Sequence, residues 1–253
     1  MALITIITST FNSAKTLERL LLSIKNQTSN DYEFIIVDGG SNDGTTNIIQ
    51  KYNNICDRVI SEKDSGIYDA WNKGINCAHG EWITFVGSDD ELIVTYIENI
   101  THIISKISHE VNLICCKVQC VNEHYQNTRV MGEAFNKKTF VKRFNIANVG
   151  ALYKRSFLIN NGLFDINYKI VGDYDFLLRN LNKVNSYYYN KIIAYMRDDG
   201  VSSQDNYLNV AREVIKTKKD NKYCCCMICY ITAFKLFLII NIKKIHKHYQ
   251  VNA

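Results

Sequence analysis

The chain has 253 residues, of which 47% are apolar and 22% are charged, and these values are typical of a globular protein with one large α/β domain, with or without an appendage. Its nine cysteines are odd in number and lack zinc-ligand spacing, so we expect reduced, mostly buried thiols in a cytosolic protein rather than a disulfide framework or a zinc centre. The formal net charge of +5 is concentrated towards the C-terminus, which suggests contact with an anionic partner.

Strands and helices are predicted to alternate four times in about the first ninety residues. The start, MALITIITST, lacks the basic segment of a signal peptide and indicates a strand. The run YEFIIVDGG is too continuously apolar for a sheet with one solvated face and suits a buried parallel strand. The predicted strands are 3–11, 32–40, 57–62 and 81–87. This order predicts a doubly wound, largely parallel sheet with helices on both faces.

Polar residues follow each of the four predicted strands at its carboxyl end, where ligands bind in sheets of this kind. The first strand ends in TSTFN, the second in DGGS, the third near EKD and the fourth in SDD. Asp, Asn and Gly also make ordinary turns, so any one cluster has a purely structural explanation. Four clusters on one rim, three of them with carboxylates, favour a ligand site.

The predicted rim lacks the glycine-rich loops that bind phosphate, since neither GxGxxG nor a Walker lysine motif is present. Carboxylates repel phosphate unless a divalent cation lies between them. Asp89 and Asp90 therefore predict a Mg²⁺ or Mn²⁺ site, because hard cations take oxygen ligands and often share them with substrate phosphates. Asp38 would then accept hydrogen bonds from the base or the ribose of a nucleotide.

Five segments of the chain, in this order, resemble those of inverting family 2 glycosyltransferases with the GT-A fold. They cover about residues 3–180 and read TIITSTFNSAKTL, YEFIIVDGGSNDGT, SEKDSGIYDAWNKGI, GEWITFVGSDD and GLFDINYKIVGDYDFLLR. The resemblance is strongest to enzymes that build bacterial O-antigen, capsule or exopolysaccharide. It implies a nucleotide-sugar donor whose diphosphate is neutralised by a metal at a short acidic motif, here Asp89 and Asp90.

The residues that the resemblance assigns to the nucleotide-sugar lie along the predicted rim and on the helix after the third strand. They are Thr8, Thr10, Asn12, Asp38, Gly40, Asp64, Asp69, Asn72, Ser88 and Asp89. Asp64 and Asp69 also have a structural explanation, with Asp64 serving as an acid near the positive end of a helix. Ile67, Trp71 and Ile75 recur with helical spacing and are expected to pack inside.

Two departures from the family's pattern affect the expected diphosphate site. Many relatives have an aspartate where this chain has Gly87, which leaves Asp89 as the expected metal ligand with Asp90 beside it. Many relatives also have an arginine at the position of Trp71. Its absence implies that another cation, or the metal alone, stabilises the leaving group.

The catalytic base is expected later in the chain, because inversion needs one group to take the proton of the attacking hydroxyl. The leaving diphosphate needs charge stabilisation, so a metal can replace the second carboxylate of a glycosidase. The segment VGDYDFLLR resembles the family's base motif, which implies Asp173 as the base and Asp175 as the second acid. The two acids could instead cap a helix at 174–181, and the roles are compatible. Arg197 either approaches the diphosphate or pairs with a neighbouring aspartate.

The C-terminal tail combines positive charge with an apolar stretch. From Ala211 onward it has nine Lys/Arg and two Asp/Glu, and Cys224 to Ile242 is apolar apart from three residues. A helix of that length is about as long as a bilayer core is thick. We expect it to lie in the membrane interface with its lysines on anionic headgroups, rather than to cover the core or span the bilayer. The predicted domains are a GT-A domain at 1–210, with a nucleotide-sugar half at 1–95 and an acceptor half at 96–210, and a helical tail at 211–253.

Together these features predict an inverting, metal-dependent hexosyltransferase that uses a UDP-sugar and a polyprenyl-diphosphate-linked saccharide in O-antigen or capsule synthesis. We expect it in the cytoplasm, peripherally bound to the inner face of the cell membrane, and we expect no nucleic-acid partner. One alternative is a sugar-1-phosphate nucleotidyltransferase, although the expected glycine- and basic-rich N-terminal signature is absent. The other is a membrane-bound, non-catalytic nucleotide-sugar-binding module. The donor sugar, the linkage and the oligomeric state stay open.

Overall fold

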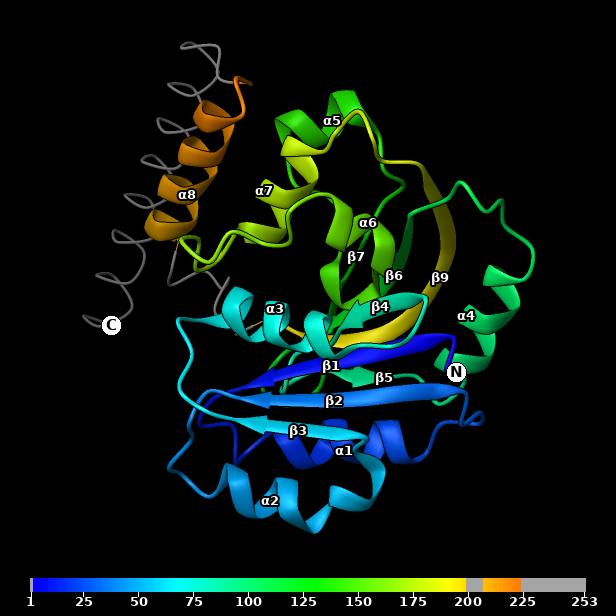
Figure 1. Ribbon diagram of the computed structural model, residues 1–253, viewed down its shortest axis with the longest axis vertical. Coiled ribbons are helices and arrows are strands. Elements are labelled where there is room, and N and C mark those ends of the chain that lie inside the picture. Colours follow the sequence, from blue (N-terminus) through cyan, green and yellow to red (C-terminus); the bar gives the residue numbers. More distant parts are fainter. Residues whose placement is uncertain (1, 199–206, 224–253) are drawn as a thin grey trace, which may run out of the picture.

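A computed structural model describes residues 2–198 and 207–223, and its centre is one curled, mixed sheet (Figure 1). The strand order is β3-β2-β1-β4-β8-β6-β9-β5, with β7 paired to β6. The strands are β1 Ile4–Thr10, β2 Tyr32–Asp38, β3 Arg58–Ser61, β4 Trp82–Phe85, β5 Glu91–Leu92, β6 Leu113–Val121, β7 Asn127–Met131, β8 Leu152–Lys154 and β9 Ser186–Arg197.

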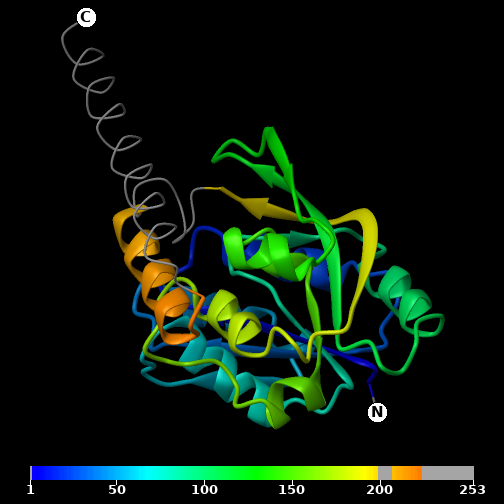
Figure 2. The same ribbon diagram turned by 90° about the horizontal axis from the view of Figure 1, so that it is seen from above.

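The helices cover both faces of the sheet. They are α1 Leu17–Lys25, α2 Thr45–Lys51, α3 Ile67–Cys77, α4 Tyr96–Ile104, α5 Lys137–Lys142, α6 Arg155–Asn160, α7 Gly172–Arg179 and α8 Tyr207–Asp220, with 3-10 turns η1 Asn53–Ile55 and η2 Asn148–Gly150. In Figures 1 and 2, α8 lies beside α7, on the side of the molecule towards which the arrowheads of β2 and β3 point. The hydroxyl of Tyr68, in the first turn of α3, binds Asp173 in the first turn of α7, so the start of α7 lies close to the rim that the sequence predicts.

The four strands predicted in the N-terminal part are confirmed as β1, β2, β3 and β4. The β1–β2, β2–β3 and β1–β4 pairs are all parallel, as predicted. The second half differs, because β8 runs antiparallel to both β4 and β6, and β7 antiparallel to β6. The whole sheet is thus mixed, and only its first half follows the doubly wound pattern.

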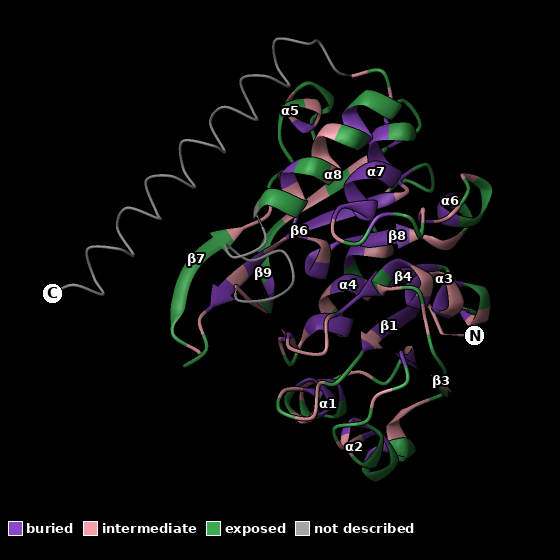
Figure 3. Ribbon diagram, turned by 90° about the vertical axis from the view of Figure 1, so that its left-hand side faces the viewer, coloured by how far each residue is buried: buried purple, intermediate pink, exposed green. Residues whose placement is uncertain are grey.

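Alternation along the parallel strands explains the two layers of core. Ile7 and Val37 pack on the side of α3, whereas Ile6 and Ile36 pack on the side of α1. Figure 3 shows the same division, with buried strands at the centre and exposed residues on the outer surfaces of the helices and along β7. A parallel strand covered on both faces is apolar throughout, which is the pattern that the sequence displays.

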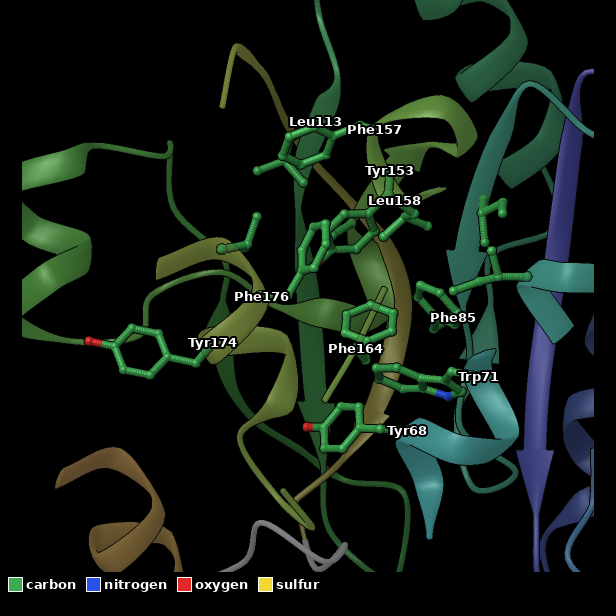
Figure 4. Close-up of a cluster of buried hydrophobic side chains, with 14 of the residues drawn as sticks. Tyr68, Trp71, Phe85, Leu113, Tyr153, Phe157, Leu158, Phe164, Tyr174 and Phe176 are labelled. Atoms are coloured by element: carbon green, nitrogen blue, oxygen red, sulfur yellow. The ribbon is translucent and has the colours of Figure 1, made fainter. Parts of the chain in front are cut away.

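An aromatic cluster joins α3 to the acceptor-side segments (Figure 4). The rings of Trp71 and Phe85 are stacked with centroids 4.3 Å apart, and Phe164 packs edge-on against both. Trp71 is confirmed as a core residue, and so is Ile75. The expectation for Ile67 is wrong, because its side chain is 37% exposed and the adjacent Tyr68 turns into the core instead.

The C-terminal part of the described chain continues the domain. Helix α8 begins at Tyr207 and packs on α7, so it crosses the boundary predicted at residue 210. Residues 224–253, to which the membrane-docking prediction applies, lie outside the described residues. Within the described ranges, every helix is too short or too polar to cross a bilayer.

Candidate active site

The turn after β4 brings two carboxylates together, because Gly87 has no side chain. A carbon placed on Gly87 would lie 2.7 Å from Oδ2 of Asp90 and 2.8 Å from Oδ1 of Asp89. A side chain at position 87 would therefore require both carboxylates to shift, because the two acids converge on its place. Burial and the nearby charge of Asp89 raise the pKa of Asp90 well above its usual range. A cation held between the two acids would offset that repulsion.

Asp90 is buried and is held by backbone donors on both sides. Its Oδ2 accepts from the N–H of Gly87 at 3.1 Å, and its Oδ1 accepts from the N–H of Arg197 at 3.0 Å. Asp89 is only partly buried. The geometry therefore makes Asp89 the better placed of the two to meet a ligand, while Asp90 ties the turn to the end of β9.

Two arginines lie near this turn. The guanidinium carbon of Arg19 lies 3.3 Å from the ring centroid of Tyr125, and that of Arg197 lies 5.2 Å from the same centroid. Arg19 also pairs with Glu91. Tyr125, at the tip of the β6–β7 hairpin, thus holds two arginines beside the acidic turn. They are candidates for the positive charge that many relatives provide with an arginine at the position of Trp71.

The pocket on the predicted rim measures about 410 Å³ and is lined by Phe11, Gly39, Gly40, Lys63 and Asp64. Phe11 is 62% exposed, so its ring offers a stacking surface.

Asp64 offers this pocket one carboxylate oxygen. Its Oδ1 accepts from the N–H of Gly66 at 2.9 Å, and its Oδ2 has no hydrogen-bond partner among residues 2–198 and 207–223. Gly39 allows this placement, because a side-chain carbon there would lie 2.6 Å from Oδ2. Gly66 has φ +123°, a conformation that glycine adopts readily, in the turn before α3.

Asp38 lies beneath the pocket with no exposed surface. Its carboxylate accepts from the N–H groups of Gly40 and Ser41 at 3.2 and 3.1 Å and from the hydroxyls of Ser41 and Ser61. In the structure these donors satisfy Asp38 completely. It holds the loop that carries Gly40, and its predicted contact with base or ribose stays a prediction that the geometry does not favour.

The loops after β1 and β2 are joined by polar contacts. Oδ1 of Asn12, whose φ is +50°, accepts from the N–H of Asn42 at 3.0 Å. The hydroxyls of Ser13 and Ser88 lie 2.8 Å apart and so connect the first loop to the acidic turn. Asn12 and Ser88 therefore both lie on the rim, as predicted.

Four other predicted donor ligands are placed differently. Thr8 and Thr10 are buried, and their hydroxyls have no hydrogen-bond partner in the described part of the chain. Asp69 accepts from the N–H of Ser65 at 2.9 Å in the first turn of α3. Asn72 exchanges two hydrogen bonds with the backbone of Phe164, at 2.8 and 3.1 Å. Asp69 and Asn72 thus have structural partners, whereas the buried hydroxyls of Thr8 and Thr10 have none among the described residues, and the donor contacts of all four stay predictions.

Asp173 combines burial with one unengaged oxygen. Its Oδ1 accepts from the N–H of Tyr174 at 2.8 Å and from the hydroxyl of Tyr68 at 3.2 Å. Its Oδ2 has no hydrogen-bond partner within the described ranges. Burial raises the pKa of Asp173 to about 6, and the two hydrogen bonds offset part of that rise. The group can therefore accept a proton near neutral pH.

Asp175 has a different environment, although it is only two residues away. It accepts from Arg179 at 3.1 Å on one oxygen and, on the other, from Thr217 of α8 at 2.7 Å and from Asn221, directly after α8, at 3.0 Å. The helix-capping alternative is wrong for both acids, because α7 begins at Gly172, its N-cap is Val171, and no side chain caps it. Asp175 anchors α7 to α8, and its predicted role as a second acid stays a prediction.

Sequence reasoning missed Phe11, Tyr68 and Glu213. Phe11 could have been noticed as an aromatic residue among polar ones at the end of a strand. Tyr68 lies one residue from the helical stripe that the sequence suggested. Glu213 gave no local signal, because its partners lie 42 to 44 residues earlier in the chain.

Comparison with known proteins settles the family. A sequence profile described as glycosyl transferase family 2 matches residues 5–161, more than half of the chain. The chain belongs to glycosyl transferase family 2. This glycosyltransferase is 29% identical over 216 residues to a PGL/p-HBAD biosynthesis glycosyltransferase of Mycobacterium bovis, which covers 78% of each chain. It is also 35% identical over 97 residues to the cholesterol galactosyltransferase of Borreliella burgdorferi, over 38% of this chain and 27% of that one.

Solved structures show that this glycosyltransferase has the GT-A fold. S. aureus TarS 1–349 in complex with UDP-GlcNAc superimposes with a TM-score of 0.68 at 20% identity, over 85% of this chain and 66% of that one. The mannosyltransferase PcManGT of Pyrobaculum calidifontis, in complex with GDP-Man and Mn²⁺, gives a TM-score of 0.66 at 15% identity, over 88% and 65%. The glycosyltransferase thus spans less than two thirds of these structures, and of one TarS chain only 39%.

The fit of a divalent metal rests on the turn after β4. Within residues 2–198 and 207–223, no group of three His, Cys, Asp or Glu side chains is gathered to hold a metal by itself. The two carboxylates that converge above Gly87 are nevertheless hard oxygen donors of the kind that Mg²⁺ and Mn²⁺ take. A pair of protein ligands completed by substrate phosphates is the usual arrangement for Mg²⁺.

Proposed function

We propose that this glycosyltransferase is an inverting hexosyltransferase that moves a sugar from a UDP-sugar to a hydroxyl of a polyprenyl-diphosphate-linked saccharide. The reaction would be a single displacement. The acceptor oxygen forms a bond to the anomeric carbon, the bond from that carbon to the diphosphate oxygen breaks, and the acceptor's proton passes to a carboxylate. UDP then leaves with the bonding electron pair.

The observation that carries this proposal is the environment of Asp173. Tyr68 and the backbone hold its Oδ1 while Oδ2 is not engaged by the described residues, so one oxygen is oriented and the other can take the proton. A pKa of about 6, raised by burial, keeps the carboxylate mostly ionised at neutral pH and more basic than an exposed aspartate. Both properties suit a general base.

The pocket beside Asp64 supports a uridine donor. One oxygen of Asp64 is taken by Gly66, so a single acceptor faces the pocket. Uracil presents one imide N–H between two carbonyls, whereas guanine presents two N–H groups to a carboxylate, and the single oxygen matches uracil. Phe11 would stack on the base, and Lys63 would lie near a carbonyl or phosphate. The likeness to TarS, which was solved with UDP-GlcNAc, agrees with this choice.

The diphosphate would meet the acidic turn after β4. Asp89 would hold Mn²⁺ or Mg²⁺ with Asp90 beside it, and the bound ion would neutralise charge on the leaving diphosphate. Arg197, whose backbone N–H already binds Asp90, would bring a second positive charge to this place. It would thereby take over the task that the buried Trp71 leaves undone.

The proposed acceptor and location rest on the relatives and on the tail. One relative is named for PGL/p-HBAD biosynthesis and another for cholesterol, which is a lipid. A lipid-linked acceptor of an O-antigen or capsule pathway would place the enzyme on the cytoplasmic face of the membrane. The basic, apolar segment 211–253 would provide the attachment, and its part beyond residue 223 lies outside the described residues.

A panel of donors tests the proposal. The full-length protein is incubated with UDP-glucose, UDP-galactose, UDP-GlcNAc and GDP-mannose, each with Mn²⁺ and each with EDTA, and release of the nucleoside diphosphate is measured. We expect turnover with at least one UDP-sugar in Mn²⁺ only, and a rate at least about 10²-fold lower for Asp173→Asn. Turnover with GDP-mannose alone would contradict the uridine assignment, and equal turnover in EDTA would contradict the metal.

A further inference from the structure

Helix α7, which carries Asp173, is held at its start by a side chain from another helix. Its N-cap, Val171, provides no side-chain cap. Instead, Glu213 of α8 accepts three consecutive backbone N–H groups, from Lys169 at 2.9 Å on Oε1 and from Ile170 and Val171 at 2.9 and 3.0 Å on Oε2. Hydrogen bonds to an ionised carboxylate are among the stronger ones in proteins, so the backbone directly before Asp173 is fixed from α8.

The same side of α8 also holds Asp175, two residues after the proposed base. Thr217 and Asn221 donate to Oδ1 of Asp175 at 2.7 and 3.0 Å. Residues 213 and 217 are spaced by four and so lie along one side of α8, and residue 221 follows the same spacing directly after its last residue. This row of three polar side chains contacts the chain on both sides of Asp173, and Figures 1 and 2 show α8 lying against α7.

Tyr68 connects the clamped backbone to the carboxylate. Its hydroxyl lies 2.8 Å from the carbonyl oxygen of Ile170 and 3.2 Å from Oδ1 of Asp173. The N–H of Ile170 is one of the three that Glu213 accepts. A shift of this loop would therefore move the group that orients Asp173, together with the start of the helix that carries it.

We propose that Glu213 is a positioning residue for the catalytic base and that α8 sets the orientation of Asp173. The inference rests on the proposed role of Asp173. Glu213 does not touch the reacting atoms, and its effect is transmitted through the backbone of residues 169–171. A base misplaced by about 1 Å can lose up to about 10²-fold in rate, so a clamp of this kind matters for turnover.

Glu213 also acts on Asp173 through its charge. The titratable groups that face Asp173 are Tyr68 from α3, Tyr153 from β8 and Glu213 from α8. Burial is the main cause of the raised pKa of Asp173, and the negative charge of Glu213 adds to it. Removing that charge should therefore lower the pKa of Asp173, an effect that a purely structural contact would not have.

The test compares Glu213→Gln with Asp220→Asn in the full-length protein. Both variants lose one negative charge from α8, but within the described residues the side-chain hydrogen bond of Asp220 is the one it accepts from the Tyr168 hydroxyl at 3.4 Å. For Glu213→Gln we expect kcat to fall about 10- to 100-fold with an unchanged KM for the UDP-sugar, because the loss is in the geometry of the base. The acid limb of the kcat profile should shift to lower pH. Asp220→Asn should match the wild type in kcat, in KM for the UDP-sugar and in the position of the acid limb.

The titration of Asp173 is followed independently of activity, through the ¹³Cγ chemical shift of labelled aspartate, with Asp173→Asn to assign the signal. A lower pKa in Glu213→Gln, but not in Asp220→Asn, supports the inference. An unchanged titration together with an unchanged kcat overturns it, even if the melting temperature falls. If Asp173→Asn retains wild-type transfer, the proposed base is wrong, while the titration still decides whether Glu213 acts on Asp173.

Discussion

The loops after β1, β2 and β4 and the α7–α8 unit both present buried carboxylates, but they hold them in opposite ways. Asp38 and Asp90 have both oxygens engaged by nearby donors, mostly within three residues along the chain. Asp173 has one oxygen engaged, and the backbone before it is held by Glu213, which lies 42 to 44 residues after the three residues that it binds. The first arrangement favours a carboxylate that stays fixed, and the second favours one that exchanges a proton.

Replacing the proposed base gives the largest expected effect. Asp173→Asn should cut the transfer rate by about 10²–10⁴-fold at saturating substrates, because the amide cannot take the acceptor's proton. UDP affinity should be unchanged, since the donor pocket is formed by other residues. Single-turnover transfer and calorimetry with UDP measure the two quantities. If Asp173→Asn transfers sugar at the wild-type rate, Asp173 is not the base, and the proposed difference between fixed carboxylates and a proton-exchanging one is wrong.

The pH profile of the wild type should report the same group. Asp173 is protonated below a pKa of about 6, and a protonated carboxyl cannot act as the base. We therefore expect kcat to be constant above that pH and to fall about 10-fold for each pH unit below it. Residual turnover by Asp173→Asn, measured over the same range, should lack this limb. If the limb persists in the variant, a different group is titrating.

Asp64 allows a test on the donor side. Asp64→Asn should weaken UDP binding by about 10-fold while kcat at saturating donor stays close to wild type, because a ground-state hydrogen bond to a charged group is lost. Glu62→Gln is a matched control, since Glu62 pairs with Lys73 and does not line the pocket. Equal UDP affinity in the wild type, Asp64→Asn and Glu62→Gln would mean that the uracil ring binds elsewhere.

The smallest effect on function is expected at Asp38. Asp38→Asn replaces an acceptor of several hydrogen bonds by a group that carries its own donors, so the free energy of unfolding should fall by about 1–3 kcal/mol. UDP affinity should change little in the folded variant. Thermal unfolding and calorimetry separate the two effects. A large loss of UDP affinity without loss of stability would restore Asp38 as a direct ligand.

The predictability of the fold follows the range of the contacts. The alternation of strands and helices along the sequence was enough to predict the parallel half of the sheet, from β1 to β4. The β8 strand, which runs antiparallel between β4 and β6, depends on pairing with segments about 40 and 70 residues away, and no local pattern announces it. The helix beginning at Tyr207 could not be separated from the tail because its polar face resembles a solvated one.

The candidate site divides in the same way. The acidic turn, Asp64 and Asp173 could be proposed from short segments, because each lies at the start or end of one element. Burial decided the rest. Thr8 and Thr10 look like rim residues in sequence, but alternation along β1 turns their side chains into the core. Asp173 and Asp175 look equivalent in the sequence, and the hydrogen bonds that Thr217 and Asn221 donate to Asp175 distinguish their environments.

Divergence within this family couples residue 39 to residue 64. A side-chain carbon on Gly39 would lie 2.6 Å from Oδ2 of Asp64, so the two positions compete for one volume. A lineage that gains a side chain at 39 must move the carboxylate of residue 64 out of its present position or replace it. We therefore expect the two positions to covary among relatives, with glycine at one accompanying an acid at the other.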